Sequence, residues 1–335
     1  MKAIVFTRYG PPDVLRLAEV DTPRPGATEV LIKVHASSVS TADWRIRASA
    51  FPGILWLPGR LMMGLFRPRN PIPGVDFAGE VTGTGEAVTR FAPGDRVFGF
   101  KGHGGNAEYL VMDQDAAIVP MPEGMGYRAA AALPFGGLSA LVFMRDIARV
   151  TPGMEVLVLG ASGGVGIYAV QIAHAMGAKV TGVCSAANAP LVRDHGAAEV
   201  IDYQKDDATR PGRFFDVVFD TVGAATFAQA RRVLRRSGAF VPLNFKGREM
   251  VQSLVAKLTG GPRLVIAVSG DTAADLQELS QMVNTGRLRA VIDRTYPLAR
   301  VPEAHGYVQM RRRRGAVIVD VIAGGDTGAS VTAAR

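Results

Sequence analysis

Four closely spaced glycines have the pattern of a phosphate-binding turn. Gly160, Gly163, Gly164 and Gly166 follow an apolar run at 156–159 and precede a segment of helical periodicity. Glycine lets the backbone turn tightly and approach a pyrophosphate closely, and the start of the following helix supplies free N–H groups and the positive end of the helix dipole. The chemistry that this pattern predicts is dinucleotide binding, with the spacing G-x-x-G-x-x-G rather than G-x-G-x-x-G.

The residues after the next strand indicate which dinucleotide the turn binds. Segment 179–184 reads as a second strand, and an NAD-binding unit usually has Asp or Glu near its end, bound to the ribose 2′-hydroxyl. Here Cys184 stands at that place, and the next carboxylate is Asp194. Four nearby side chains are hydrogen-bond donors: Ser185, Asn188, Arg193 and Tyr203. Donors bind a 2′-phosphate whereas an acid repels it, so we expect NADPH, although Arg193 could instead be a solvated helix residue.

Composition predicts a protein of two domains without disulfides. The chain has 335 residues, of which 48% are hydrophobic and 20% charged, so a sizeable core is expected. The single cysteine, Cys184, excludes an internal disulfide and multi-cysteine zinc sites. Residues 1–10 read as a strand rather than a signal peptide, and no apolar run reaches the roughly 20 residues of a spanning helix. We expect a cytoplasmic protein that does not span a membrane.

The net charge of +8 raises the question of an anionic partner. The densest basic run is the four arginines at 311–314, without regularly interleaved aromatic residues or a recognition motif. A solvated face that also attracts an anionic cofactor explains this run, and we expect no nucleic-acid partner.

Segment 51–66, F-P-G-I-L-W-L-P-G-R-L-M-M-G-L-F, is apolar but interrupted by proline and glycine. It is too short to span a membrane. It could be a core element, a loop or short helix that walls an apolar pocket, or a membrane-surface contact. Methionines adapt to varied ligands, which favours the pocket wall.

The elements that position these residues change in character along the chain. Residues 1–126 are β-rich, with clear alternation over 29–39, whereas strands and helices alternate from Tyr127, as in a doubly wound parallel sheet. The later predicted elements are strands at 199–202, 216–220, 238–243 and 263–268, helices at 224–235 and 271–285, and strands at 291–296 and 316–321. We expect an α/β protein with domains 1–126 and 127–270 and a disordered tail over 323–335.

Several short motifs, in this order, carry a family resemblance. They are V-L-I-K-V-H-A-S-S-V-S-T-A-D-W, P-G-V-D-F-A-G-E-V, P-G-D-R-V-F-G, G-G-N-A-E-Y, L-P-F-G-G-L-S-A-L, the glycine turn, F-D-T-V-G and V-I-D-R-T-Y-P-L. The chain resembles the medium-chain dehydrogenase/reductase superfamily, and within it the zinc-independent quinone oxidoreductase-like members. The resemblance implies a GroES-like β-rich catalytic domain, a Rossmann domain, a return of the chain to the first domain over 271–322, and a homodimer formed through the strand at 263–268.

The positions that bind catalytic zinc in related alcohol dehydrogenases carry other residues here. They fall at Ser40, Val75 and Phe135, none of which is a zinc ligand in this setting. The five histidines show no paired metal spacing. We therefore expect no zinc.

Without a Lewis acid, substrates that accept hydride easily are favoured, namely quinones and α,β-unsaturated carbonyls. The expected activity is hydride transfer from NADPH to such a substrate. One alternative is an enoyl-thioester or alcohol/aldehyde-type reductase. Another is a weakly catalytic NADPH-binding regulatory or RNA-binding protein.

The resemblance also assigns roles to individual residues. It places Gly163, Gly164 and Val165 at the pyrophosphate, Ser139 near the nicotinamide, and Ser185, Asn188 and Tyr203 at the 2′-phosphate. Leu243, Asn244 and Phe245 follow a strand whose end is expected to face the nicotinamide.

Two residues are candidates for catalysis. Ser40 stands where related reductases have Asn, and its hydroxyl could donate to the substrate oxygen. Asp43 matches the family's Asp and could donate a proton if burial raises its pKa. Alternatively, Asp43 caps the helix that begins near Trp44, and water supplies the proton.

Overall fold

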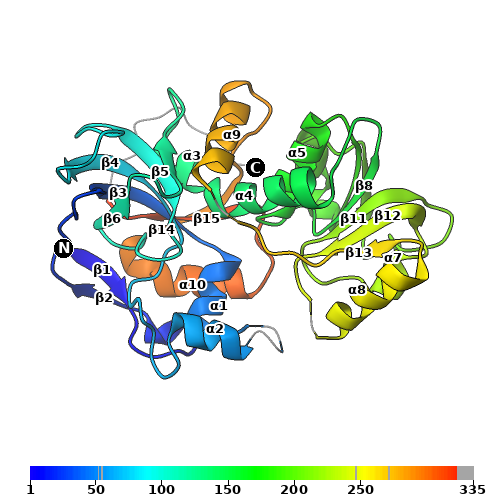
Figure 1. Ribbon diagram of the computed structural model, residues 1–335, viewed down its shortest axis with the longest axis horizontal. Helices are drawn as coiled ribbons and strands as arrows, with labels where there is room; N and C mark the ends of the chain where they lie inside the picture. The colour runs from blue at the N-terminus through cyan, green and yellow to red at the C-terminus, as the bar shows by residue number, and fades with distance from the viewer. Residues whose placement is uncertain (52, 54–55, 246, 271, 323–335) are drawn as a thin grey trace. The chain divides into compact units, whose positions relative to one another are not determined.

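The computed structural model describes residues 1–51, 53, 56–245, 247–270 and 272–322. The chain divides into two compact units, each drawn in Figure 1. Unit 1 comprises Met1–Phe51, Leu55–Phe135 and Asp271–Arg335, and unit 2 comprises Pro52–Ile54 and Gly136–Gly270. The tail predicted over 323–335 lies outside the described residues.

Unit 2 is built on a parallel sheet with the order β10-β9-β8-β11-β12-β13. Its strands are β8 (Glu155–Leu159), β9 (Lys179–Cys184), β10 (Glu199–Asp202), β11 (Phe215–Asp220), β12 (Leu234–Pro242) and β13 (Arg263–Leu264). The middle strands β8 and β11 contain the buried apolar runs 156–159 and 217–219, as expected of a sheet whose two faces are both covered. The order is that of a doubly wound dinucleotide-binding fold, as the sequence predicts.

The connections in unit 2 are helical. They are α4 (Pro134–Val142) with a following π-helical turn (Phe143–Ile147), α5 (Gly166–Ala175), the 3-10 turn η4 (Ala186–Asn188), α6 (Ala189–Asp194), α7 (Phe227–Ala230) and α8 (Gly247–Thr259). Gly177, with φ +82°, ends the α5 segment in the left-handed region that glycine favours. The β-α-β unit predicted around the glycine turn is therefore confirmed.

Two predicted boundaries in unit 2 were wrong. The helix expected over 224–235 is reduced to α7, since Leu234 pairs with Phe215 of β11 and the Phe215 N–H donates to the Val233 carbonyl at 2.7 Å. The backbone of this segment satisfies its hydrogen bonds in the sheet rather than in a helix. The strand expected over 263–268 is confined to β13, whose ladder to β12 covers Arg263 and Leu264.

Unit 1 is built on a mostly antiparallel sheet with the order β14-β15-β3-β4-β5-β7, and β6 also pairs with β3. Its strands are β3 (Glu29–Val39), β4 (Asp76–Thr84), β5 (Arg96–Phe100), β6 (Tyr109–Asp113), β7 (Ile118–Pro120), β14 (Ile292–Pro297) and β15 (Ala316–Asp320). Strands β1 (Lys2–Val5) and β2 (Arg16–Glu19) form a separate antiparallel pair. The alternation predicted in β3 is confirmed, because Val30, Ile32 and Val34 are fully buried.

Unit 1 also contains helices, some of which contribute side chains to its core. They are η1 (Pro12–Val14), α1 (Thr41–Ala48), α2 (Trp56–Met63), α3 (Tyr127–Ala131), α9 (Ala273–Asn284), η5 (Leu298–Arg300) and α10 (Val301–Gln309). Figure 1 shows α10 beside α1, and the core includes Phe6, Trp44, Val301 and Val317. The chain thus returns to its first unit after residue 271.

The long segment of unit 2 begins at Gly136 rather than at Tyr127, where strands and helices begin to alternate in the sequence. Helix α3 contacts strands β3, β4, β5 and β15 of unit 1. The Arg128 guanidinium forms a two-pronged ion pair with the Asp320 carboxylate, with N–O distances of 2.7 and 2.8 Å. The first helical segment after the β-rich region therefore still belongs to unit 1, and the boundary between the units lies after it.

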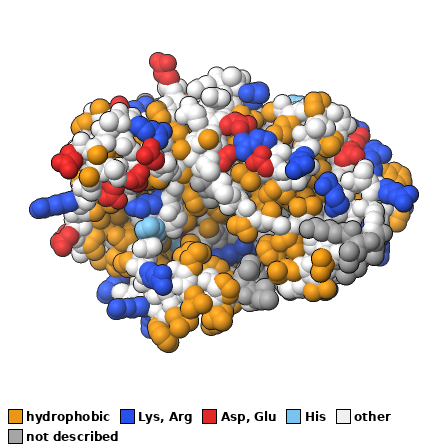
Figure 2. All heavy atoms as spheres, viewed as in Figure 1, with side chains coloured by type: hydrophobic (Ala, Val, Ile, Leu, Met, Phe, Trp, Pro, Cys, Tyr) orange, Lys and Arg blue, Asp and Glu red, His pale blue; other side chains and the backbone are white. Residues whose placement is uncertain are grey.

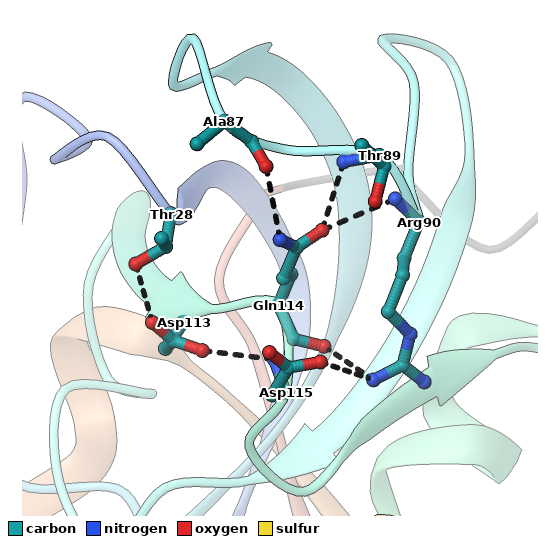
Figure 3. Close-up of polar contacts among 7 residues, drawn as sticks. All are labelled: Thr28, Ala87, Thr89, Arg90, Asp113, Gln114 and Asp115. Carbon is teal, nitrogen blue, oxygen red and sulfur yellow. Dashed lines mark hydrogen bonds and ion pairs between the residues drawn. The ribbon is translucent and has the colours of Figure 1, made fainter.

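Gln114, which follows β6, ties together neighbouring loops of unit 1 (Figure 3). Its Oε1 accepts hydrogen bonds from the N–H groups of Thr89 at 2.9 Å and Arg90 at 3.1 Å, and its Nε2 donates to the Ala87 carbonyl at 3.1 Å. The Arg90 guanidinium in turn donates to the Gln114 carbonyl and to the Asp115 carboxylate. One buried amide therefore satisfies three backbone groups of a loop without regular structure.

Candidate active site

The glycine turn of unit 2 lies between β8 and α5. Gly160 has φ +77°, and a Cβ on Gly166 would lie 2.1 Å from the Gly160 carbonyl oxygen. No side chain caps the start of α5 in the described structure, where Val165 is the residue before the helix. A turn closed to side chains and an uncapped helix start are the features that fit a pyrophosphate. Gly163, Gly164 and Val165 lie in this turn.

Helix α4 approaches the same turn closely through a glycine. A Cβ on Gly136 would lie 2.1 Å from the Gly164 carbonyl oxygen and 2.8 Å from the Tyr168 ring. Ser139, half-buried, lies three residues further along α4. The sequence analysis did not single out Gly136, although the G-G pair inside a helical segment is the signal that could have found it.

The carboxyl end of β11 carries two polar residues that the sequence analysis did not assign to the site. The buried Asp220 carboxylate accepts hydrogen bonds from the N–H groups of Val222, Gly223 and Ala225 at 3.0, 2.7 and 2.9 Å. It therefore shapes the loop at the strand end. A buried strand that ends in an acid before T-V-G is the signal that could have revealed it.

The second of these residues, Thr221, links that loop to the strands beside it. Its hydroxyl donates to the Leu159 carbonyl at 2.8 Å, and its own carbonyl accepts from the Asn244 amide at 3.2 Å. Asn244 is thereby held at the end of the sheet that carries the glycine turn. Leu243 and Phe245, its neighbours, are half-buried.

Three of the four predicted 2′-phosphate residues lie near the carboxyl end of β9. Ser185 follows that strand directly, Asn188 donates to the Ser162 hydroxyl of the glycine turn at 3.0 Å, and the Tyr203 N–H donates to the Cys184 carbonyl at 3.2 Å. The Tyr203 side chain is 61% exposed. Of these residues, Asn188 is the one that the hydrogen bonds join directly to the glycine turn.

Arg193 and Cys184 have different surroundings. Arg193 lines a depression along β10 together with Lys205 and Arg213, and Ser185 and Asn188 do not line it. Burial and the neighbouring Asp202 carboxylate raise the pKa of the Cys184 thiol to about 11. The thiol is protonated at neutral pH and is a poor nucleophile.

In unit 1, Ser40 and Asp43 form a capping box at the start of α1. Asp43 Oδ2 accepts hydrogen bonds from the Ser40 N–H at 2.7 Å and from the Ser40 hydroxyl at 2.6 Å. Asp43 Oδ1 accepts from the N–H groups of Gly74 and Val75, each at 3.1 Å. The Ser40 hydroxyl proton is therefore directed at Asp43.

The Asp43 carboxylate is 1% exposed. Burial raises its pKa above the ordinary value, and the hydrogen bonds from Ser40, Gly74 and Val75 oppose that rise. The structure thus places the two candidate catalytic residues in direct contact, with the carboxylate at the centre of a bonded cluster.

The three positions that correspond to zinc ligands come together in unit 1. Val75 is tied to Asp43, and the Phe135 N–H donates to the neighbouring carboxylate, Asp76 Oδ1, at 3.0 Å. Asp76 Oδ2 accepts from the Ser38 hydroxyl at 2.5 Å. A hydroxyl, an isopropyl group and a benzyl group do not form a zinc site. Among the described residues, no group of three or more His, Cys, Asp or Glu is arranged to hold a metal ion.

The arginine run at 311–314 is only partly a solvated surface. The Arg313 guanidinium donates to the Val39 carbonyl and the Thr41 hydroxyl, each at 3.0 Å, and Arg314 lies 3.6 Å from the Asp293 carboxylate. This run therefore anchors the C-terminal segment to the start of α1, beside Ser40.

Comparisons with known proteins agree with this arrangement. Residues 26–123 match the family described as alcohol dehydrogenase GroES-like domain, and residues 195–319 match the family described as zinc-binding dehydrogenase. A quinone oxidoreductase of Pseudomonas aeruginosa is 31% identical, and the match covers 95% of this chain and 99% of that protein. A quinone oxidoreductase of Mus musculus is also 31% identical, over 91% and 93% of the two chains. The structure of the quinone oxidoreductase from Coxiella burnetii superposes with a TM-score of 0.84 at 30% identity, covering 96% of this chain and 99% of that one.

A GroES-like unit and a doubly wound unit with a glycine turn define an oxidoreductase that uses a nicotinamide cofactor. The chain belongs to the medium-chain dehydrogenase/reductase superfamily, in its quinone oxidoreductase-like branch. It is an enzyme with a quinone-oxidoreductase-type function. Within the described ranges, no helix combines the length and hydrophobicity needed to cross a membrane.

Proposed function

We propose that this enzyme transfers hydride from NADPH to a quinone or an α,β-unsaturated carbonyl without the aid of zinc. The observation that carries the cofactor preference is the end of β9. Ser185 and Asn188 lie there beside the glycine turn, and residues 185–193 contain no carboxylate. A 2′-phosphate would meet hydroxyl, amide and backbone donors from the 185–188 segment, while the Asp202 carboxylate stands on the neighbouring strand opposite Cys184.

The residues of unit 2 bind and orient the cofactor. Bound NADPH supplies the hydride. Gly163, Gly164 and Val165 receive the pyrophosphate at the start of α5, and α4 brings Ser139 toward the nicotinamide end. The Thr221–Asn244 contact holds the 243–245 loop at the same end of the sheet. Their contribution is position, which fixes the reacting atoms of cofactor and substrate.

In unit 1 we assign Asp43 a positioning role. Its carboxylate already accepts four hydrogen bonds, from Ser40, Gly74 and Val75, and so holds α1 and the 73–75 loop together. Water then supplies the proton that the reduced substrate takes up. The absence of ligating side chains at Ser40, Val75 and Phe135 favours acceptors that need no Lewis acid.

The first test measures NADPH and NADH oxidation by metal-stripped enzyme with a naphthoquinone, an aliphatic enone, an enoyl thioester and a simple aldehyde. We expect turnover of quinone or enone with NADPH, unaffected by chelator. Turnover of aldehyde alone, or only after zinc is added, would overturn the zinc-free mechanism. NADPH binding without turnover would favour the regulatory alternative.

Ser185→Asp tests the cofactor preference. We expect kcat/KM for NADPH to fall about tenfold or more, which corresponds to about 1.4 kcal/mol of charge repulsion, with little loss for NADH. Ser185→Ala is the matched control and should lose only one hydrogen bond. Arg193→Ala shows whether that guanidinium also meets the phosphate. Equal losses for both cofactors in Ser185→Asp would contradict the assignment.

We also propose a cytoplasmic homodimer. Strand β13 lies at the edge of the parallel sheet with β12 as its neighbour, and an edge strand can pair with a second copy. The buried Cys184 suits a reducing compartment. Sedimentation equilibrium should give twice the chain mass, and a proline in place of Leu264 should reduce it to one chain.

A further inference from the structure

Helix α2 and the turn after it expose a continuous group of large apolar side chains. We call this group the α2 patch, and its members are Trp56, Leu57, Leu61, Met62, Leu65 and Phe66. Their exposed fractions run from 37% for Leu65 to 88% for Phe66. Single exposed apolar residues are ordinary, but six within eleven positions form a patch that needs a partner.

The other side of this segment is attached to unit 1, so the exposure is a property of an anchored helix. The Tyr9 hydroxyl donates to the carbonyls of Met63 and Gly64 at 3.0 and 2.7 Å. Gly59 is buried, and a Cβ there would lie 2.8 Å from the Phe51 ring. The helix therefore turns one side inward and holds the apolar side chains outward.

The charged residues in the stretch of chain that contains the patch have one sign. Residues 44–75 contain five arginines and no Asp or Glu. The Arg60 guanidinium lies over the Tyr9 ring at 4.0 Å and near the Trp56 ring at 5.7 Å, and Arg67 and Arg69 are exposed. Figure 2 shows hydrophobic side chains gathered over the part of unit 1 where α2 lies, with Lys and Arg at the margin.

We propose that the α2 patch binds the surface of an anionic phospholipid bilayer. Trp, Leu, Met and Phe are side chains that enter the boundary between headgroups and acyl chains, and arginines beside them meet lipid phosphates. A second copy is a poorer occupant, because a two-fold contact through this patch would set Arg60, Arg67 and Arg69 against their own copies. The inference does not depend on the cofactor or the substrate.

The two tryptophans of the chain make the binding measurable. Trp56 is 46% exposed within the patch, whereas Trp44 is 9% exposed in the core of unit 1. Adding vesicles of phosphatidylcholine with phosphatidylglycerol should shift the emission to shorter wavelength and sediment the protein with the lipid. Trp56→Phe should abolish the shift but leave sedimentation, and pure phosphatidylcholine should retain little protein.

Variants separate the apolar and the charged contributions. The double change Leu61→Ser and Phe66→Ser should reduce vesicle affinity at least tenfold. The matched control is Val251→Ser with Leu254→Ser on α8 of unit 2, which alters two side chains of similar exposure (64% and 62%) and should leave affinity unchanged. Arg67→Ala and Arg69→Ala should each lower the affinity for anionic vesicles about fivefold, and high salt should lower the affinity of the wild-type protein in the same way.

Several results would overturn the proposal. These are failure of the folded wild-type chain to bind anionic vesicles, equal binding to neutral vesicles, and equal losses in the α8 control. The patch would instead bind a second copy if, without lipid, the wild-type protein has the molar mass of an oligomer and only the Leu61→Ser, Phe66→Ser variant has a lower mass. Quenching of Trp56 by a naphthoquinone, without any effect of vesicles, would assign it to the substrate.

Discussion

His305 of α10 is a fully buried imidazole in unit 1. Neither ring nitrogen has a hydrogen-bond partner among the described residues. Burial, together with the positive charge of Arg47, lowers the pKa of His305 to about 3. The ring is therefore neutral in the folded protein throughout the physiological range, and it takes up its proton only when the protein unfolds.

We predict that His305 makes stability depend on pH. Its folded-state pKa lies below the ordinary value of 6.5, so between pH 6.5 and about 3 the unfolded state binds the extra proton. This contribution is complete above pH 6.5 and falls by about 1.4 kcal/mol per pH unit as the pH decreases through that range. In urea unfolding at a series of pH values, His305→Phe should show a shallower decline than wild type. The control is His174→Gln at an exposed position; equal slopes for wild type and His305→Phe would contradict the prediction.

At the scale of residues, local patterns were predictable and distant partners were not. The sequence suggested that Asp43 caps a helix beginning near Trp44, but the helix begins at Thr41, Ser40 is its N-cap, and Asp43 takes part as the third helical residue of the capping box. The bonds from Gly74 and Val75 to Asp43 join residues more than thirty positions apart. Nothing local in the sequence indicates that meeting.

Among elements, the contact of α4 with the glycine turn depends on the absence of a single methyl group. The backbones at Gly136 and Gly164 approach so closely that a Cβ on Gly136 would collide with the Gly164 carbonyl oxygen. Because α4 carries Ser139 and the turn carries Gly163–Val165, this contact sets the spacing between the two ends of the proposed cofactor site.

Gly136→Ala tests that contact. In an unconstrained helix interior the change would stabilise by about 1 kcal/mol, but here the new Cβ meets a backbone oxygen at 2.1 Å. We expect a net loss of about 2 kcal/mol or more in the free energy of unfolding, and weaker NADPH binding by calorimetry. Gly247→Ala, at a glycine with open space around it, should change neither quantity. A stabilised Gly136→Ala enzyme with intact NADPH affinity would show that the contact is dispensable.

Elements were predictable where one periodicity dominates. Strand β3 covers the residues that its alternation indicated, whereas segment 224–235 reads as helical and yet its last two residues belong to β12. Leu234 joins the strand because it pairs with Phe215 of β11. Such pairing depends on the neighbouring strand and cannot be predicted from the segment's own sequence.

The whole molecule is assembled from segments far apart in the chain. In unit 1, β15 lies between β14 and β3, with Val317 paired to Val39. The Arg128–Asp320 ion pair fastens the same strand to α3. Composition predicts two domains and the family resemblance predicts the return of the chain, but the boundary at Gly136 follows from the packing of α3 on the strands of unit 1 and could not be predicted from the change in sequence pattern at Tyr127.

A chain that ends at residue 314 lacks β15 and tests this dependence. We expect hydrogen exchange to become fast in β3 and β4, which lose a neighbour and part of the core, while β8, β9 and β11 of unit 2 stay protected. A chain that ends at residue 322 keeps β15 and should exchange as the full chain does. Protection of β3 in the shorter chain would show that unit 1 closes without its last strand.

The pairing of β15 with the end of β3 also sets an order of events on the ribosome. Residues 36–39 of β3 are made early, but their partners at 317–320 are among the last described residues to be synthesised. Unit 2 has all its strands by residue 264, so it can fold while the sheet of unit 1 still has an open edge. The first-made part of this protein must therefore stay unaggregated through most of translation, and a slow-moving ribosome or a missing chaperone would affect unit 1 before unit 2.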